Sequence, residues 1–131
     1  AYSFVIRRTW DKWRMRIIQR TLTGHIVIAG FGDTGREAAE ELIARGTAPA
    51  QLVVIDCLAD PIAVAEALGC TVIQGDASRD ETLKAVRIET ARSLVVAPGR
   101  DDTAVLITLT AGHLAPALAI STMVRAEDNE L

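Results

Sequence analysis

Short aliphatic runs, separated by longer segments of mixed polarity, form the main pattern of the chain. Five runs recur at intervals of about 20–26 residues. They cover residues 26–29, 52–55, 71–73, 94–97 and 118–120. Apolar and polar residues do not alternate within the runs, which is typical of parallel strands that are covered on both faces. The pattern therefore predicts five buried parallel strands, and each interval has room for one crossover helix.

Helix signals fill the intervals between these runs. The expected helices cover residues 33–45, 60–68, 78–87 and 101–114. Asp60 precedes Pro61, so we expect Asp60 to be the N-cap of the second helix, and we expect Ser78 to open the third. Alternating strands and helices with right-handed crossovers predict an α/β fold, a doubly wound parallel sheet (Rossmann-like) with strand order 3-2-1-4-5. This fold usually has a sixth strand, so we expect the chain to be truncated before the last strand and to be a piece of a longer protein.

Charge divides the chain into two parts. Residues 1–23 contain six basic residues and one acidic residue, together with both tryptophans and the only tyrosine, whereas residues 24–131 contain eight basic and sixteen acidic residues. We therefore separate a basic lead-in (1–23) from a globular domain (24–131). A solvated connector helix and a juxtamembrane segment in contact with anionic lipid both fit the lead-in. The formal net charge of −3 excludes bulk electrostatic binding of a nucleic-acid polymer.

A glycine-rich loop follows the first predicted strand and opens the first predicted helix, which is the context that the G-x-G-x-x-G motif requires. The motif consists of Gly30, Phe31, Gly32, Asp33, Thr34 and Gly35. Gly30 permits a tight turn, Gly32 lets a pyrophosphate approach the backbone, and Gly35 allows close contact between helix and strand. The helix N-terminus offers N–H groups and the positive end of its dipole to phosphates. Asp33 adds a carboxylate to this loop, and Arg36 can offset its charge.

Asp56 ends the second strand, 21 residues after Gly35. At this position a carboxylate can accept hydrogen bonds from both hydroxyls of an adenosine ribose. A 2′-phosphate would be repelled there, and no arginine follows closely. The position therefore favours NAD(H) or an adenine nucleotide over NADP. The alternative role for Asp56 is to cap the next turn of the chain.

Further candidates follow the other strands at the same edge of the sheet. Asp76 and Ala77 come after the third strand, and Asp76 serves either as a ligand-binding residue or as an N-cap or turn residue. Ala97 follows the fourth strand at the topological switch point, where small residues leave room for a ligand. The residues expected to bind the cofactor are Gly30, Phe31, Gly32, Asp33, Thr34, Gly35, Asp56, Cys57, Asp76, Ala77 and Ala97.

Candidates for catalysis are sparse. We interpret His25 and His113 as structural residues and expect no catalytic residue. No cluster of histidine, cysteine and carboxylate residues indicates zinc. Cys57 and Cys70 fall at opposite ends of neighbouring predicted strands, too far apart for a disulfide. We therefore predict two free thiols and a reducing compartment.

Taken in order, these motifs resemble the N-lobe of RCK (regulator of potassium conductance) domains and the NAD-binding domain of Trk-type potassium uptake regulators. The resemblance is carried by residues 30–35, 52–56, 75–77, 106–111 and 124–127. It covers residues 24–131, which is most of the chain. Two positions depart from the pattern, since many relatives carry arginine where Asp33 stands and asparagine where Ala104 stands.

The resemblance implies a non-catalytic, ligand-sensing regulatory domain of a prokaryotic potassium channel or transporter, at the cytoplasmic face of the membrane. Such domains bind NAD(H), ATP/ADP or a cation, assemble as dimers or as rings of up to eight copies, and transmit ligand binding to the pore. The lead-in would then be the linker from the last pore helix. Two alternatives remain. One is the cofactor-binding domain of an NAD-dependent oxidoreductase, and the other is a structural, ring-forming lobe that has lost its ligand.

Overall fold

The computed structural model describes residues 22–97 and 101–123. The lead-in (1–23), apart from its last two residues, lies outside these described residues. So does the segment 124–127, which contributes to the family resemblance.

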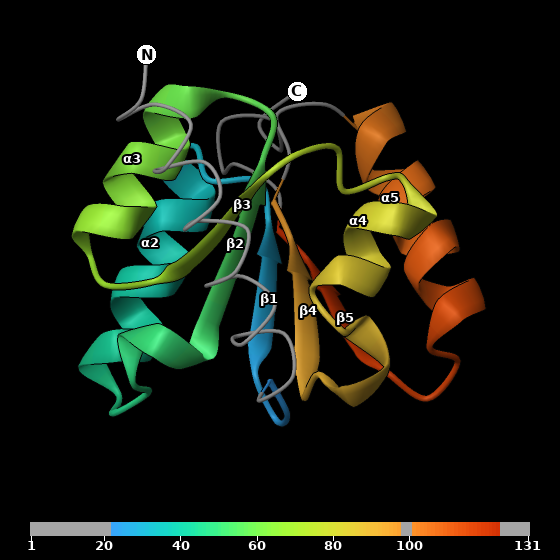
Figure 1. Cartoon of the computed structure of the whole chain (residues 1–131), viewed down its shortest axis with the longest axis horizontal. Coiled ribbons are helices and arrows are strands. Elements are labelled where there is room, and N and C mark those ends of the chain that lie inside the picture. Colours follow the sequence, from blue (N-terminus) through green and yellow to red (C-terminus); the bar gives the residue numbers. More distant parts are fainter. Residues whose placement is uncertain (1–21, 98–100, 124–131) are drawn as a thin grey trace, which may run out of the picture.

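One parallel sheet forms the centre of the molecule (Figure 1). Its strands are β1 (Ile26–Ala29), β2 (Leu52–Asp56), β3 (Thr71–Gln74), β4 (Ser93–Val96) and β5 (Ala119–Thr122). They lie side by side in the order β3-β2-β1-β4-β5, and every neighbouring pair is parallel. The predicted doubly wound fold and its strand order are therefore confirmed.

Helices cover both faces of the sheet, with α2 and α3 on one side and α4 and α5 on the other (Figure 1). The α-helices are α2 (Asp33–Ala44), α3 (Ala59–Ala67), α4 (Asp80–Ala85) and α5 (Asp101–Leu114). Two short 3₁₀ helices precede strands, η1 (Pro49–Gln51) before β2 and η2 (Ile88–Thr90) before β4. Among the described residues, no helix combines the length and the apolar character needed to cross a membrane.

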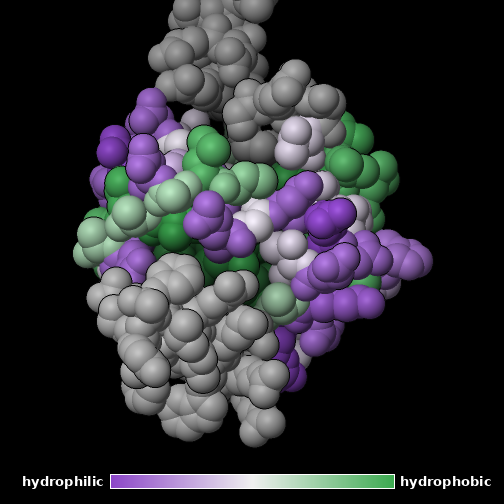
Figure 2. Space-filling view, turned by 45° about the horizontal axis from the view of Figure 1, so that its top comes forward, coloured by the Kyte–Doolittle hydropathy of each residue, from purple (hydrophilic) through white to green (hydrophobic). Residues whose placement is uncertain are grey.

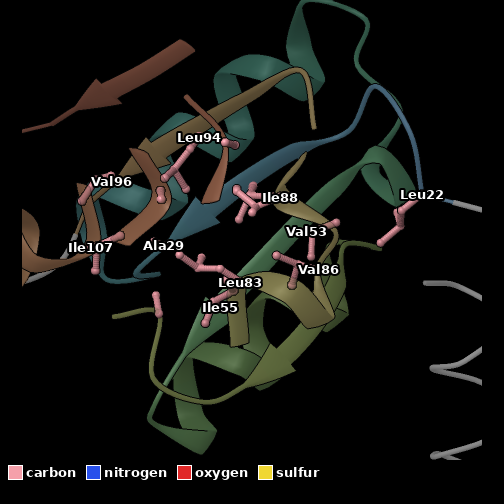
Figure 3. Close-up of a cluster of buried hydrophobic side chains, with 14 residues drawn as sticks. Leu22, Ala29, Val53, Ile55, Leu83, Val86, Ile88, Leu94, Val96 and Ile107 are labelled. Atoms are coloured by element: carbon pink, nitrogen blue, oxygen red, sulfur yellow. The ribbon is translucent and has the colours of Figure 1, made fainter. Parts of the chain in front are cut away.

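Two hydrophobic clusters, one on each face of the sheet, form the core. Strand β1 contributes to both, since Val27 and Ala29 pack with residues of α4 and α5, whereas Ile26 and Ile28 pack with residues of α2 and α3. Figure 3 shows the first cluster. All four β1 side chains are buried because both faces are covered, and this explains why the run is uniformly apolar.

Residues 22–25, which precede β1, are hydrogen-bonded to residues 90–92, which precede β4. Leu22 is buried in the first cluster, and its carbonyl accepts a hydrogen bond from Thr90 Oγ1 at 3.0 Å. The Gly24 N–H donates to the Thr90 carbonyl at 2.9 Å, and the Arg92 N–H donates to the His25 carbonyl at 2.7 Å. Three backbone positions before β1 are therefore tied to residues that are far away in sequence.

The predicted capping residues of two helices are wrong. The N-cap of α3 is Leu58, so Asp60 lies inside the first turn and makes no side-chain cap. The N-cap of α4 is Arg79, and Ser78 lies before it. Local residue preferences misplaced both starts because upstream carboxylates bind the backbone N–H groups of Leu58 and Ser78 and so fix the turns that precede these helices.

Candidate functional site

The loops that follow β1, β2, β3 and β4 emerge at one edge of the sheet, because parallel strands all point the same way. The order β3-β2-β1-β4 reverses direction between β1 and β4, which makes this edge the topological switch point. It is the part of the molecule on which the candidate residues were expected to converge. Figure 2 views the molecule with this end turned forward.

The turn after β1 depends on two glycines. Gly30 has a φ of 101°, which favours glycine, and its N–H donates to the Ile55 carbonyl at 2.8 Å. A Cβ on Gly35 would lie 2.1 Å from the carbonyl oxygen of Gly30, which no real side chain tolerates. The first turn of α2 therefore lies directly against the loop, as the motif predicts.

Gly32 provides the open position of the loop. It is the N-cap of α2 and is exposed, and a Cβ placed on it would meet nothing within 4 Å. Its carbonyl accepts the first helical hydrogen bond, from the Arg36 N–H at 2.9 Å, and no side chain caps the helix start. The first backbone N–H groups of a helix have no partner within that helix, so this end can offer donors to an anion.

Phe31 contributes through its backbone. Its side chain is buried in the second cluster with Ile28 and Ile62, so it belongs to the hydrophobic core. Its N–H donates to Asp56 Oδ2 at 2.8 Å. This bond joins the loop after β1 to the end of β2, 25 positions later in the sequence.

Asp56 holds two turns at once. Besides the bond from Phe31, its Oδ1 accepts a hydrogen bond from the Leu58 N–H at 2.9 Å, so the alternative role as a turn cap is confirmed. A carboxylate offers about four acceptor positions, and these two bonds leave one on each oxygen. The remaining acceptors match the two hydroxyls of a ribose in number. The ribose-binding role stays a prediction.

Asp76 behaves as a turn residue in this structure. Its Oδ1 accepts hydrogen bonds from the Ser78 hydroxyl at 2.6 Å and from the Ser78 N–H at 2.9 Å. These two bonds lower the pKa of the Asp76 carboxyl below its usual value, with a smaller contribution from the charge of Arg79. The turn function of Asp76 is thus observed, whereas contact with a ligand remains a prediction.

Cys57 lies exposed between the two acids. Its Sγ donates to the Gly75 carbonyl at 3.3 Å, and burial raises the pKa of its thiol, with further contributions from Asp76 and Asp56. Cys70 is buried at the opposite end of the strand pair, and both cysteines are free, as predicted. The thiol at the candidate site is therefore accessible but poorly ionised.

Two small buried residues, Ala97 and Ala77, lie at the same edge of the sheet. Ala97 donates its N–H to the Ala29 carbonyl at 2.8 Å and is only 5% exposed, and Ala77 belongs to the first cluster. Thr34, in the first turn of α2, is half-buried. The two alanines add no polar group to this edge of the sheet.

The start of α2 carries both acidic and basic side chains. Arg36 lies 4.0 Å from the carboxylate of Asp33 and 3.6 Å from that of Glu40, and all three side chains are about half exposed or more. The predicted compensation of Asp33 by Arg36 is therefore observed, although Arg36 is shared with Glu40.

Neither histidine has the setting of a catalytic base. His25 is fully buried, and its Nε2 donates to the Val86 carbonyl at 2.6 Å. Burial lowers the pKa of His25, and the nearby Arg87 lowers it further. His113 is exposed in the last turn of α5. In the described part of the chain, no group of three metal-ligating side chains comes together.

Sequence reasoning missed Leu58. Its side chain is 65% exposed next to Asp56, and its N–H is held by that carboxylate. An apolar residue two positions after a strand-end acid was the available signal.

These features define a class, namely doubly wound domains that present a glycine-rich loop and an acid at the switch point. A family model for the TrkA-N domain matches residues 26–131, and the chain belongs to this family. Potassium channel protein 1 of Methanocaldococcus jannaschii is 35% identical over 126 residues, a match that covers 90% of this chain and 36% of that protein. The chain thus spans about a third of the length of this curated relative.

Solved structures with the same fold agree with this assignment. The TrkA-N domain of inner membrane protein ybaL from Escherichia coli superimposes with a TM-score of 0.71 at 23% identity, covering 82% of this chain and 78% of that one. The C-terminal domain of Shewanella denitrificans Kef in AMP-bound form gives 0.64 at 30% identity, covering 75% and 56%. The GsuK channel bound to NAD gives 0.68 at 24% identity, covering 84% and 20%. The resemblance to RCK and TrkA-N domains is confirmed.

Proposed function

We propose that residues 24–131 bind an adenine nucleotide or dinucleotide, NAD(H) or ATP/ADP, across the loop after β1 and the end of β2. The observation that carries this proposal is the bond between the Phe31 N–H and Asp56 Oδ2. It fixes a carboxylate with spare acceptors beside an open helix start, which is the arrangement that an adenosine phosphate needs. Structures with this fold have been solved with NAD, ADP and AMP, and these complexes support the proposal.

The ligand would be held from two ends. The phosphates would lie over Gly32, where the backbone is open, and would receive N–H groups from the first turn of α2. The ribose hydroxyls would donate to Asp56. The exposed Leu58 side chain, which follows Asp56, offers an apolar surface to the adenine ring.

The domain would act as the cytoplasmic sensor of a potassium channel or transporter, at the inner face of the membrane. The curated relative, a potassium channel protein, supports this role. Bound nucleotide would favour one arrangement of neighbouring domains, and the lead-in (1–23), in contact with anionic lipid, would pass the shift to the pore. A ligand can move such an equilibrium only by the ratio of its affinities for the two arrangements.

Self-association is part of the same proposal, with assemblies from dimers to rings of eight. Three apolar side chains on α5 support it, since Val105, Leu106 and Leu109 are 61%, 52% and 66% exposed. Figure 2 shows hydrophobic surface on the side where Figure 1 places α5. Exposed apolar patches of this kind are common at protein interfaces. Sedimentation of Leu109→Glu should then show smaller assemblies than the wild type, and an unchanged distribution would exclude α5 from the interface.

Calorimetric titration tests the nucleotide site. Asp56→Asn keeps the shape of the side chain but removes the charge and one acceptor oxygen, and it should weaken binding of NADH and AMP about 10- to 100-fold, because hydrogen bonds to a charged group contribute about 1.5–3 kcal/mol each. Glu66→Gln, an exposed change on α3, is the matched control and should bind as the wild type does. Equal affinity of Asp56→Asn and wild type would refute the site.

The oxidoreductase alternative makes a different prediction. In the oxidoreductase alternative, the full-length protein would support hydride exchange between NADH and a simple alcohol or hydroxy acid. A sensor would bind NADH without consuming it. Absorbance at the NADH band during long incubation with such substrates separates the two functions.

A further inference from the structure

Gln74 ends β3 directly beside Asp56, the last residue of β2. Its side chain is exposed, and its Nε2 donates a hydrogen bond to the Cys57 carbonyl at 3.1 Å, across 17 positions of sequence. A carbonyl oxygen only accepts hydrogen bonds, so the amide nitrogen of Gln74 must make this contact. Gln74 therefore restrains the loop that follows β2.

The peptide group between Cys57 and Leu58 is held at both ends. Its carbonyl oxygen accepts the bond from Gln74. Its N–H donates to Asp56 Oδ1 at 2.9 Å. A peptide group is planar and trans, so its C=O and N–H are fixed in opposite directions. The bond that orients the carbonyl therefore also orients the N–H that holds the Asp56 carboxylate.

The Asp56 carboxylate is thereby fixed from two sides. Its Oδ2 accepts from the Phe31 N–H at 2.8 Å, and its Oδ1 accepts from the Leu58 N–H. Together these bonds set the plane of the carboxylate and the directions of its two remaining acceptor positions. Without the bond from Gln74, the 57–58 peptide would be free to turn toward water, and one of the two restraints on this plane would weaken.

We infer that Gln74 is a positioning residue of the nucleotide site, which acts through the 57–58 peptide to aim the spare acceptors of Asp56 at the two hydroxyls of a ribose. This inference rests on the nucleotide site proposed above. Gln74 does not touch the ligand in this arrangement. Its contribution to affinity therefore depends on the ribose hydroxyls and is absent for a ligand that lacks them.

A pair of ligands isolates this contribution. AMP carries both ribose hydroxyls, 2′,3′-dideoxy-AMP carries neither, and the two share the same base and phosphate. Wild-type protein should bind AMP at least about tenfold more tightly, because hydrogen bonds to a charged group are strong ones. Asp56→Asn should lose most of this preference.

Gln74→Met keeps the length of the side chain and removes its donor. It should weaken AMP about fivefold and leave dideoxy-AMP within about twofold, which is the loss expected from one hydrogen bond. Combined with Asp56→Asn it should cause no further loss, because the two residues act through one set of bonds. Gln51→Met is the matched control, since Gln51 is an exposed glutamine before the opposite end of β2, and it should bind both ligands as the wild type does. Calorimetric titration of the 131-residue chain measures these affinities.

Amide hydrogen exchange gives a second readout that needs no ligand. In Gln74→Met the Leu58 N–H should exchange faster, because the peptide that carries it is no longer held at its carbonyl. The Gly75 N–H donates to the Asp56 carbonyl at 2.9 Å and should keep its wild-type rate, which shows that the ends of β2 and β3 stay paired. Gln51→Met should change neither rate.

The outcomes separate this inference from the proposed function. If Asp56→Asn lowers the preference for AMP and Gln74→Met does not, the nucleotide site stands and the positioning role is overturned. An equal loss of both ligands in Gln74→Met also overturns it, because a general effect on the loop would not depend on the ribose hydroxyls. An unchanged exchange rate at Leu58 overturns it as well. If the wild type binds neither ligand, the nucleotide site is refuted and the positioning role falls with it.

Discussion

The contact between Gly35 and Gly30 leads to the sharpest test of how the loop after β1 is built. In Gly35→Ala the new Cβ would lie 2.1 Å from the Gly30 carbonyl oxygen, so backbone would have to move by roughly an ångström. The atoms that move belong to a loop held by two hydrogen bonds of 2.8 Å, from Gly30 to Ile55 and from Phe31 to Asp56. A backbone shift that relieves the clash would therefore also weaken these two hydrogen bonds.

The magnitude follows from three contributions. Overpacking costs about 1–3 kcal/mol, and weakening two hydrogen bonds costs about 1 kcal/mol each. Replacing glycine by alanine inside a helix returns up to about 1 kcal/mol. Gly35→Ala should therefore lower the free energy of unfolding by about 3 kcal/mol, which corresponds to a fall in Tm of about 10 °C for a domain of this size.

Gly112→Ala supplies the matched control. Gly112 lies within α5, and a Cβ added there meets nothing within 4 Å. The same chemical change should raise the free energy of unfolding by up to about 1 kcal/mol. Urea titrations followed by far-UV circular dichroism measure both variants. If Gly35→Ala proves as stable as Gly112→Ala, the close approach of helix and loop is not present in solution and the reasoning fails.

Three further predictions concern titratable groups and turns. Burial lowers the pKa of His25 in the folded state, so the free energy of unfolding should be highest above about pH 6.5 and should fall as the pH drops below this value. The midpoints of urea unfolding at pH 7.5 and pH 5.5 should therefore differ less in His25→Gln than in the wild type. The control His113→Gln should keep the wild-type difference. Cys57 should react with a thiol reagent in the native protein, but more slowly than an ordinary cysteine because its pKa is raised. Cys70 is buried and should react only after unfolding, so two thiols that react equally fast in the native protein would contradict its burial. Asp76→Ala removes both bonds of its turn and should lower the midpoint of urea unfolding slightly, and an unchanged midpoint would show that the turn does not depend on the carboxylate.

Local patterns in the sequence determined the sheet and the loop. The uniformly apolar run at residues 26–29 predicted a strand buried on both faces, because only a doubly covered sheet buries successive side chains that point in opposite directions. The spacing of Gly30, Gly32 and Gly35 predicted the close helix approach, since the absence of a Cβ is a property of the residue itself. These signals are short in range, and so they can be read without knowing the fold.

Tertiary structure decided which groups hold one another. The start of α3 was misplaced at Asp60 because the preceding turn is held by the Asp56 carboxylate. The burial of Phe31, and the bond from its backbone to the end of β2, depend on β1 and β2 being neighbours. Periodicity describes one segment at a time, whereas hydrogen bonds and burial at this edge arise between segments that only the folded sheet brings together.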